Sequence, residues 1–138
     1  VENEGPMPAK FLFEDPDPAA IESHSAWLRP HFVTTPQFFL GAVQAFVLES
    51  DGRRIVVDTC VGNDKTRPNK AWHKLQGPFL RDLAAAGFPR ESIDLVVCTH
   101  LHVDHVGWNT RLADGRWVPT FPNAKYLFSR RDYAHWDP

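Results

Sequence analysis

The spacing of apolar and polar residues predicts a β-hairpin in the second quarter of the chain. Residues 40–49 alternate in polarity and then run apolar, and a second strand-like segment covers residues 53–59, with an apolar centre at residues 55–57. The Ser50-Asp51-Gly52 segment between them has the residue types of a tight turn. We therefore predict two antiparallel strands, the second of which delivers Asp58 into a loop.

The next stretch predicts a helix followed by a buried strand. An apolar stripe at helical spacing lies in residues 79–84, after Pro78, which suits a helix start, and before Gly87, which suits a helix end. Residues 93–99 have few polar interruptions, as expected for a central strand covered on both faces. This order of elements predicts an α/β sheet, and such sheets commonly hold their chemistry at the carboxyl ends of their strands.

Shorter elements are predicted in the last third of the chain. We expect a short helical segment after Gly107 and strands at residues 117–121 and 125–128. Ser129, with an acidic residue three positions later, has the pattern of a helix cap and predicts a helix through Trp136.

The first 36 residues differ from the rest because they are rich in proline and acidic in patches. This composition predicts an irregular arm over residues 1–36, with a short helical turn at residues 19–25. The aromatic side chains of Trp27 and Phe32 are expected to pack the arm against a domain that occupies residues 37–138.

Candidate metal ligands are concentrated directly after the predicted buried strand. Three imidazoles and one carboxylate fall within six residues, at His100, His102, Asp104 and His105. These groups are the usual ligands of zinc and similar divalent cations. At the end of a strand, His100 and His102 would project to the same side, whereas Asp104 and His105 would point in different directions, so one loop could address two metals. The alternative is a solvated polar loop, but such a loop has no reason to concentrate ligands there.

Two segments resemble the metallo-β-lactamase-fold hydrolases. His100-Leu101-His102-Val103-Asp104-His105 matches the family's His-x-His-x-Asp-His signature, and the run ending in Asp58-Thr59-Cys60 is similar to its strand ending in Asp-Thr-Gly. The resemblance runs from about Phe38 to the C-terminus. It implies an αββα sandwich of the α/β (α+β) class, a site for one or two zinc ions or other divalent metals, and a zinc-bound hydroxide as nucleophile.

The resemblance also implies ligands that residues 1–138 do not supply. In that family a further histidine, a metal-bridging aspartate and a last histidine come from the second half of the domain, and nothing after His105 matches them convincingly. We therefore expect residues 37–138 to be the N-terminal half of such a domain. The isolated 138-residue chain is expected to be inactive, and to pair with the missing C-terminal half or with itself.

The resemblance implies a role for each residue of the motif. His100 and His102 would hold one metal, and Asp104 and His105 would begin the second, with Asp104 also placed to accept a proton from the attacking water. Alternatively, Asp104 caps a helix that starts near His105. Asp58 either accepts backbone hydrogen bonds in its own turn or orients a ligand histidine from behind.

The expected activity is zinc-dependent hydrolysis of a small-molecule ester or lactone, because the chain is most like the lactonase and organophosphate-hydrolase-like branches. A phosphoester hydrolase or nuclease of the same superfamily is the nearest alternative. A third possibility is a non-catalytic metal-binding module, which would bind zinc without hydrolysis.

Charge and hydropathy narrow the set of partners. The sequence has 15 Lys and Arg against 17 Asp and Glu, a net charge of −2, so neither nucleic acid nor an anionic membrane is expected as partner. No apolar run is long enough to span a bilayer, and no signal peptide is visible. The compartment stays open, with a cytoplasmic location favoured.

The remaining polar residues are expected to be structural. Cys60 and Cys98 are predicted to be free buried thiols, although Cys60 could lie near the metals. His24 and His31 stand outside any motif. Residues 66–76 are expected to form an ordinary surface loop rather than a lid.

Overall fold

The computed structural model describes residues 1–137 and divides into two compact units. The larger unit contains Val1–Glu2 and the chain from Val43 onward, and the smaller one contains Asn3–Ala42. The predicted metal loop lies in the larger unit. The predicted boundary after residue 36 stays a prediction.

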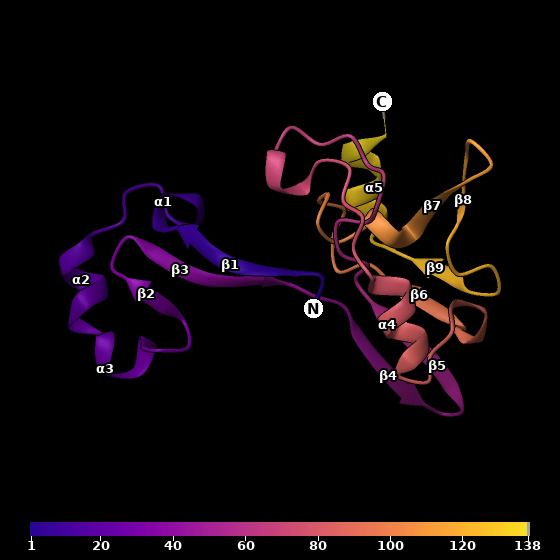
Figure 1. Cartoon of the computed structure of the whole chain (residues 1–138), viewed down its shortest axis with the longest axis horizontal. Coiled ribbons are helices and arrows are strands. Elements are labelled where there is room, and N and C mark those ends of the chain that lie inside the picture. The colour runs from indigo at the N-terminus through magenta and orange to yellow at the C-terminus, as the bar shows by residue number, and fades with distance from the viewer. Residues whose placement is uncertain (138) are drawn as a thin grey trace. The chain divides into compact units, whose positions relative to one another are not determined.

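The larger unit is built on a four-stranded sheet in the order β4-β5-β6-β9 (Figure 1). These strands are β4 (Phe46–Ser50), β5 (Arg53–Val57), β6 (Leu95–Val97) and β9 (Lys125–Leu127). β4 and β5 form the predicted antiparallel hairpin, and β6 runs parallel to both β5 and β9. The hairpin turn has positive φ angles at Asp51 and Gly52, 50° and 69°. An Asp-Gly pair adopts this conformation readily, and the conformation suits the right-handed twist of the strands.

One face of this sheet is covered by α4 (Phe79–Ala85), the helix predicted after Pro78. Leu83 of α4 packs in a cluster with Val56 of β5, Val96 of β6 and the fully buried Phe121. This cluster is the core of the unit, and it fixes β5 and β6 side by side.

The opposite face of the sheet is apolar but largely uncovered. Register places Phe46, Val57, Val97 and Leu127 in one row across the four strands. Phe46 and Leu127, at the two ends of the row, are 56% and 49% exposed. An apolar sheet face normally packs against a second layer, so this unit has the character of one layer of a sandwich.

Shorter elements complete the larger unit. The hairpin of β7 (Thr110–Ala113) and β8 (Arg116–Pro119) forms a separate two-stranded sheet. Helix α5 (Arg130–Trp136) begins as predicted, because Ser129 Oγ accepts hydrogen bonds from the backbone N–H groups of Arg131 and Asp132. Single 3₁₀ turns occupy Lys70–Trp72, Arg90–Ser92 and Gly107–Asn109.

The smaller unit contains regular structure where an irregular arm was expected. A three-stranded sheet in the order β1-β3-β2 is formed by β1 (Asn3–Pro8), β3 (Phe38–Val43) and β2 (Val33–Thr35). Three short helices accompany it, α1 (Ala9–Leu12), α2 (Pro18–Ser23) and α3 (Ser25–Leu28). The expectation of irregular chain was therefore wrong. Two of the prolines stand at helix starts rather than in irregular chain, with Pro8 at the N-cap of α1 and Pro18 in the first turn of α2.

Both cysteines are free and buried, as predicted. Cys60 is 0% exposed, and burial together with the nearby carboxylate of Glu2 raises the pKa of its thiol to about 12. A protonated, enclosed thiol is a poor accessory group for a metal site. Separately, none of the helices within residues 1–137 combines the length and the apolar character that crossing a membrane requires.

Lys65 ties the loop after β5 to the β7–β8 hairpin. Its Nζ donates hydrogen bonds to the Thr110 Oγ1 at 2.6 Å and to the Thr110 carbonyl at 3.1 Å, and it lies 3.6 Å from the Trp117 ring centre. Burial, with the nearby Arg67 charge, lowers the pKa of Lys65 to about 8 from an ordinary value of 10.5.

We expect the stability conferred by Lys65 to rise with pH. Between pH 8 and 10.5 the unfolded chain holds the lysine proton and the folded chain has lost it, so folding becomes more favourable across this window. Urea denaturation at several pH values should show the wild type gaining stability relative to a Lys65→Met variant, which has no such proton. A difference that stays constant from about pH 7 to 10.5 would contradict this assignment.

Candidate metal centre

Parallel pairing brings the two loops of the candidate site together. Register places Val57 beside Val97 at the carboxyl ends of β5 and β6. The chain continues directly into Asp58 on one strand and, after Cys98, into Thr99 and the histidine loop on the other. The Asp58 N–H donates to the Val97 carbonyl at 2.9 Å, which carries the pairing one residue beyond the strand.

Asp58 is the buried centre of the site. It is 8% exposed, and its φ of 57° turns the chain so that the carboxylate faces the neighbouring loop. The carboxylate accepts hydrogen bonds from the Thr99 N–H at 2.8 Å, the Thr99 hydroxyl at 2.8 Å and His105 Nδ1 at 2.9 Å. Burial alone would raise the pKa of Asp58, but the hydrogen bonds from His105 and Thr99 outweigh it and hold that pKa below its usual value.

These contacts select between the two readings of Asp58. Its side chain bonds across to the histidine loop, at Thr99 and His105, rather than within its own turn. The structure therefore brings Asp58 to one of the predicted ligand histidines. A carboxylate behind a histidine is the arrangement that fixes ring orientation at many metal sites.

The same carboxylate sets the proton position on two imidazoles. His105 donates its Nδ1–H to Asp58, so its Nε2 carries a lone pair. The Thr99 hydroxyl gives its proton to Asp58, so it accepts from His100 Nδ1 at 3.1 Å and leaves the His100 Nε2 as a lone pair too. Both rings thus present the nitrogen that a cation would need.

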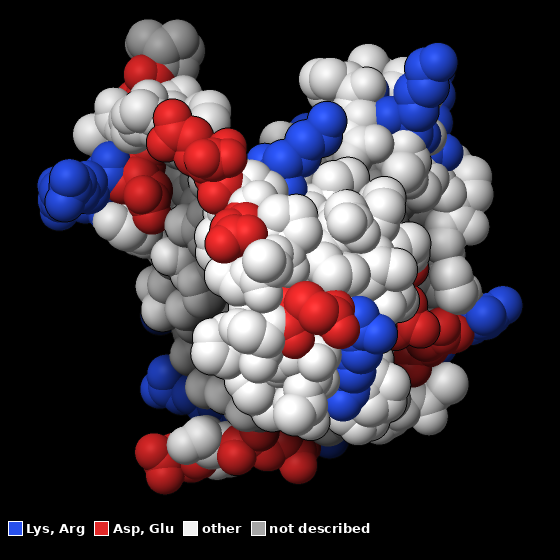
Figure 2. Space-filling model, turned by 90° about the vertical axis from the view of Figure 1, so that its left-hand side faces the viewer, with Lys and Arg blue, Asp and Glu red and all other residues white. Residues whose placement is uncertain are grey.

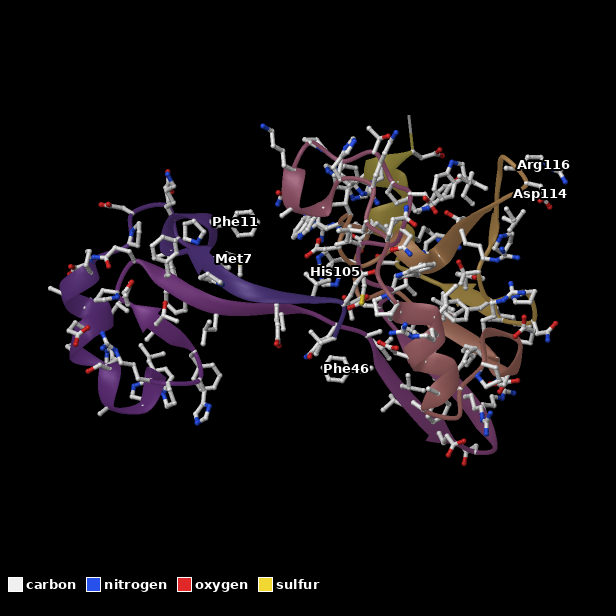
Figure 3. All side chains as sticks on the ribbon, viewed as in Figure 1. Met7, Phe11, Phe46, His105, Asp114 and Arg116 are labelled. Atoms are coloured by element: carbon white, nitrogen blue, oxygen red, sulfur yellow. The ribbon has the colours of Figure 1, made fainter. Side chains whose placement is uncertain are left out.

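The side chains of the motif lie close together on one loop, on which Figure 3 labels His105. The ring centres of His100 and His105 lie 3.9 Å apart, and that of His102 lies 4.8 Å from His100. Asp104 Oδ2 lies 3.5 Å from His105 Nε2. The segment is a turn and not the strand end that was expected. The His105 N–H donates to the His102 carbonyl and closes this turn, which brings the adjacent Asp104 and His105 side chains together.

The capping alternative for Asp104 is not what the structure shows. The helical turn that follows begins at Gly107, and its N-cap position is Val106, with no side-chain cap. The Asp104 carboxylate is 28% exposed and faces His105. It is available for a ligand.

The donor set fits a divalent cation chemically but is not a complete cage. The Asp104 carboxylate oxygen and His105 Nε2 lie 3.5 Å apart, and either a proton on that nitrogen or a metal ion would supply the positive charge that favours this approach. Across residues 1–137, however, no three His, Cys, Asp or Glu side chains converge as a metal site requires. The loop therefore supplies side chains of the kinds that bind divalent metals, but these side chains are only partly arranged around a common point.

Three neighbours of the loop were missed by the sequence reasoning. Thr99 relays between Asp58 and His100, and the ring of Trp136 on α5 lies edge-on to His102 at 5.9 Å. Arg67 reaches the Val103 carbonyl at 3.5 Å, and its Nε is buried without a hydrogen-bond partner among the described residues. Burial lowers the pKa of Arg67 and the Asp104 carboxylate offsets part of this effect. Residues 66–76 are therefore more than a remote surface loop.

Backbone contacts clamp the far end of the histidine loop to the Asp58 loop. The Thr59 N–H donates to the His105 carbonyl at 2.7 Å, and the N–H groups of Gly107 and Trp108 donate to the carbonyls of Cys60 and Thr59. The two backbones touch where both residues are glycine. A Cβ on Gly62 would lie 2.6 Å from the Gly107 carbonyl carbon, and a Cβ on Gly107 would overlap the Val61 carbonyl.

The sequence profile described as the metallo-beta-lactamase superfamily matches residues 39–138. The chain belongs to this superfamily. The match covers both loops of the candidate site and confirms the resemblance drawn from the His-x-His-x-Asp-His motif. Its first residue lies close to the predicted start of the domain at residue 37.

Several solved hydrolase structures share the fold of the chain. The chain is similar to a dizinc quorum-quenching lactonase, AidC, solved with a product (TM-score 0.71, 18% identity), and to a probable metal-dependent hydrolase from Staphylococcus aureus (TM-score 0.71, 17% identity). It is also similar to the hydrolase AbOPH (TM-score 0.67, 23% identity). No curated protein matches the sequence.

The alignments cover nearly all of this chain but less than half of each solved structure. The three structures align with 98%, 97% and 99% of this chain, but the chain spans only 42%, 46% and 42% of theirs. The predicted α/β metallo-β-lactamase fold is confirmed, and residues 1–138 correspond to part of it. The uncovered sheet face of Phe46 and Leu127 is consistent with a fold that continues beyond this part.

Proposed function

We propose that these residues carry the first part of the metal centre of a zinc-dependent hydrolase that acts on small-molecule esters or lactones. The observation that carries the proposal is the Asp58 carboxylate, which holds His105 directly and His100 through Thr99, in both cases at Nδ1, so that this support leaves both Nε2 atoms unused. A solvated polar loop would not need a buried carboxylate to fix two ring orientations.

Each residue of the loop has a proposed task. His100, His102 and His105 bind metal, and Asp104 binds metal and accepts a proton from the attacking water. Zinc, when bound, polarises the scissile carbonyl and lowers the pKa of water toward neutrality. Asp58 and Thr99 orient the rings from behind and touch no substrate. Further ligands are proposed to come from the rest of the domain, which would also cover the apolar sheet face.

Two observations favour a lactone or ester as the substrate class. AidC is a lactonase that was solved with a product, and it shares the fold at low identity. On the face of the molecule that Figure 2 shows, acidic and basic side chains are interspersed rather than gathered into a basic patch. The chain as a whole has 15 Lys and Arg against 17 Asp and Glu, so it offers no excess of positive charge to a polyanion, and a neutral carbonyl substrate is the better match.

A phosphoester is the second candidate, and one observation favours it. The Arg67 guanidinium lies beside the loop, with one of its terminal nitrogens 3.5 Å from the Val103 carbonyl, and its positive charge would complement an anionic phosphoester. An Arg67→Met variant separates the two classes, because it should impair turnover of a phosphoester far more than that of a lactone.

The proposal is tested with the full-length protein, loaded with zinc, on lactones, aryl esters, thioesters and phosphotriesters. We expect turnover of a lactone or aryl ester that a chelator abolishes. Zinc binding with no turnover of any class would replace the enzyme by a metal-binding module. Preference for the phosphotriester would move the assignment to the second candidate.

A further inference from the structure

We infer that Glu2 is a positioning residue of the metal centre, an assignment that rests on the proposed function. Its carboxylate accepts hydrogen bonds from residues that follow each of the two loops that carry the candidate ligands. Glu2 belongs to the same compact unit as both loops, although 59 to 106 residues separate it from its partners.

Three donors converge on the Glu2 carboxylate. Oε2 accepts the Val61 N–H at 2.6 Å, and both oxygens lie 3.2–3.3 Å from the Gly62 N. Oε1 accepts the Trp108 indole N–H at 2.6 Å. Positive φ angles at Cys60 and Gly62, 52° and 79°, shape this part of the backbone, where successive N–H groups form an anion-binding concavity. Glu2 fills that concavity.

The position of these donors gives Glu2 leverage on the ligands. Val61 and Gly62 follow Asp58 by three and four residues, and Trp108 follows His105 by three. The Trp108 ring is itself held, because it is 5% exposed and stacks on Phe79 of α4 at 5.4 Å. Glu2 therefore ties the Asp58 loop to a fixed side chain that follows the histidine loop, by contacts separate from the His105 Nδ1–Asp58 contact.

An amide cannot replace this carboxylate. In Glu2→Gln one oxygen becomes an NH₂ group, which must face either the Val61 and Gly62 N–H groups or the Trp108 indole N–H. Either choice sets donor against donor. The loops should then separate at this point, and the spacing between Asp58 and His105 should become less well defined.

Zinc affinity of the full-length protein tests the inference. Competition with a chromogenic chelator should show Glu2→Gln binding zinc about tenfold more weakly than wild type, the lower end of the effect typical of groups that orient ligands. The matched control is Glu4→Gln, the same change at an exposed position two residues away. A Glu2→Gln affinity equal to that of Glu4→Gln overturns the inference, even where Glu2→Gln lowers the melting temperature.

Amide hydrogen exchange on the metal-free protein provides a readout that does not depend on hydrolysis or metal. Glu2→Gln should lose protection at Val61 and Gly62, and also at Gly107 and Trp108, whose N–H groups bond to the Asp58 loop. Loss confined to Val61 and Gly62 would make Glu2 a local cap and overturn the inference. This arm stands if the proposed hydrolase activity fails.

Trp108→Phe keeps an aromatic ring at this buried position and removes the indole donor together with part of the ring volume, and it serves if Glu2→Gln does not fold. We expect a smaller loss of zinc affinity than for Glu2→Gln, and a double variant no weaker than Glu2→Gln itself, because the two changes break one link. Unchanged zinc affinity in Trp108→Phe, or losses that simply add in the double variant, would contradict a joint positioning role.

Discussion

Replacing Asp104 with asparagine in the full-length protein is expected to lower turnover by about two orders of magnitude or more, the usual loss for a general base. The variant keeps the size of the side chain but removes its charge and basicity. The ligands expected for the first metal, His100 and His102, are untouched, so that metal should stay largely bound while the second binds more weakly. Metal content and rate are measured on the same preparation.

The control for this variant is Asp114→Asn. Asp114 lies in the exposed turn of the β7–β8 hairpin (Figure 3), where its φ of 50° also suits asparagine. We expect wild-type metal content and turnover from it. If Asp104→Asn also kept both, Asp104 would be neither a ligand nor a base, and its approach to His105 Nε2 at 3.5 Å would have no role in catalysis.

Asp58→Asn is expected to weaken metal binding by about 10- to 100-fold without removing a ligand. The asparagine cannot accept from Thr99 and His105 as the carboxylate does, so His105 loses the partner that holds its Nδ1 proton. The ring can then carry its proton on Nε2, the nitrogen that faces Asp104. Metal affinity by chelator competition, with imidazole ¹⁵N shifts to report the tautomer, measures both consequences.

Asp51→Asn is the matched control, because Asp51 has nearly the same φ, 50° against 57°, and stands in an exposed turn remote from the histidines. It should bind metal as the wild type does. Wild-type affinity in Asp58→Asn, with His105 still protonated at Nδ1, would show that the buried carboxylate only stabilises the loop.

Local pattern predicted the fold wherever a short stretch determines its own structure. The Asp51-Gly52 turn, the helix after Pro78 and the Ser129 cap each depend on a few neighbouring residues, and the structure has all three. The prediction for the first 36 residues was wrong because local composition does not determine their structure. Proline content does not tell a helix start from a break, and Pro18 begins a helix that Asp17 caps through the Ala19 N–H.

Only the motif residues of the candidate site, with a supporting role for Asp58, could be predicted from the sequence. The cluster from His100 to His105 is visible in sequence, and the Asp58 resemblance suggested a supporting role. The partners that fix the site depend on strand register and on contacts between distant residues. Glu2, 106 positions from Trp108, carries no motif that marks it, and Arg67 lies in a stretch whose composition is that of any polar loop.

The most direct test is removal and return of metal in the full-length protein, followed on a lactone substrate together with metal content. We expect the native protein to contain one or two zinc ions, a chelator to remove them with all turnover, and zinc to restore both. A His100→Ala, His102→Ala double variant should neither retain the first metal nor recover. Undiminished hydrolysis after complete metal removal would contradict the metal-dependent mechanism assigned to this loop.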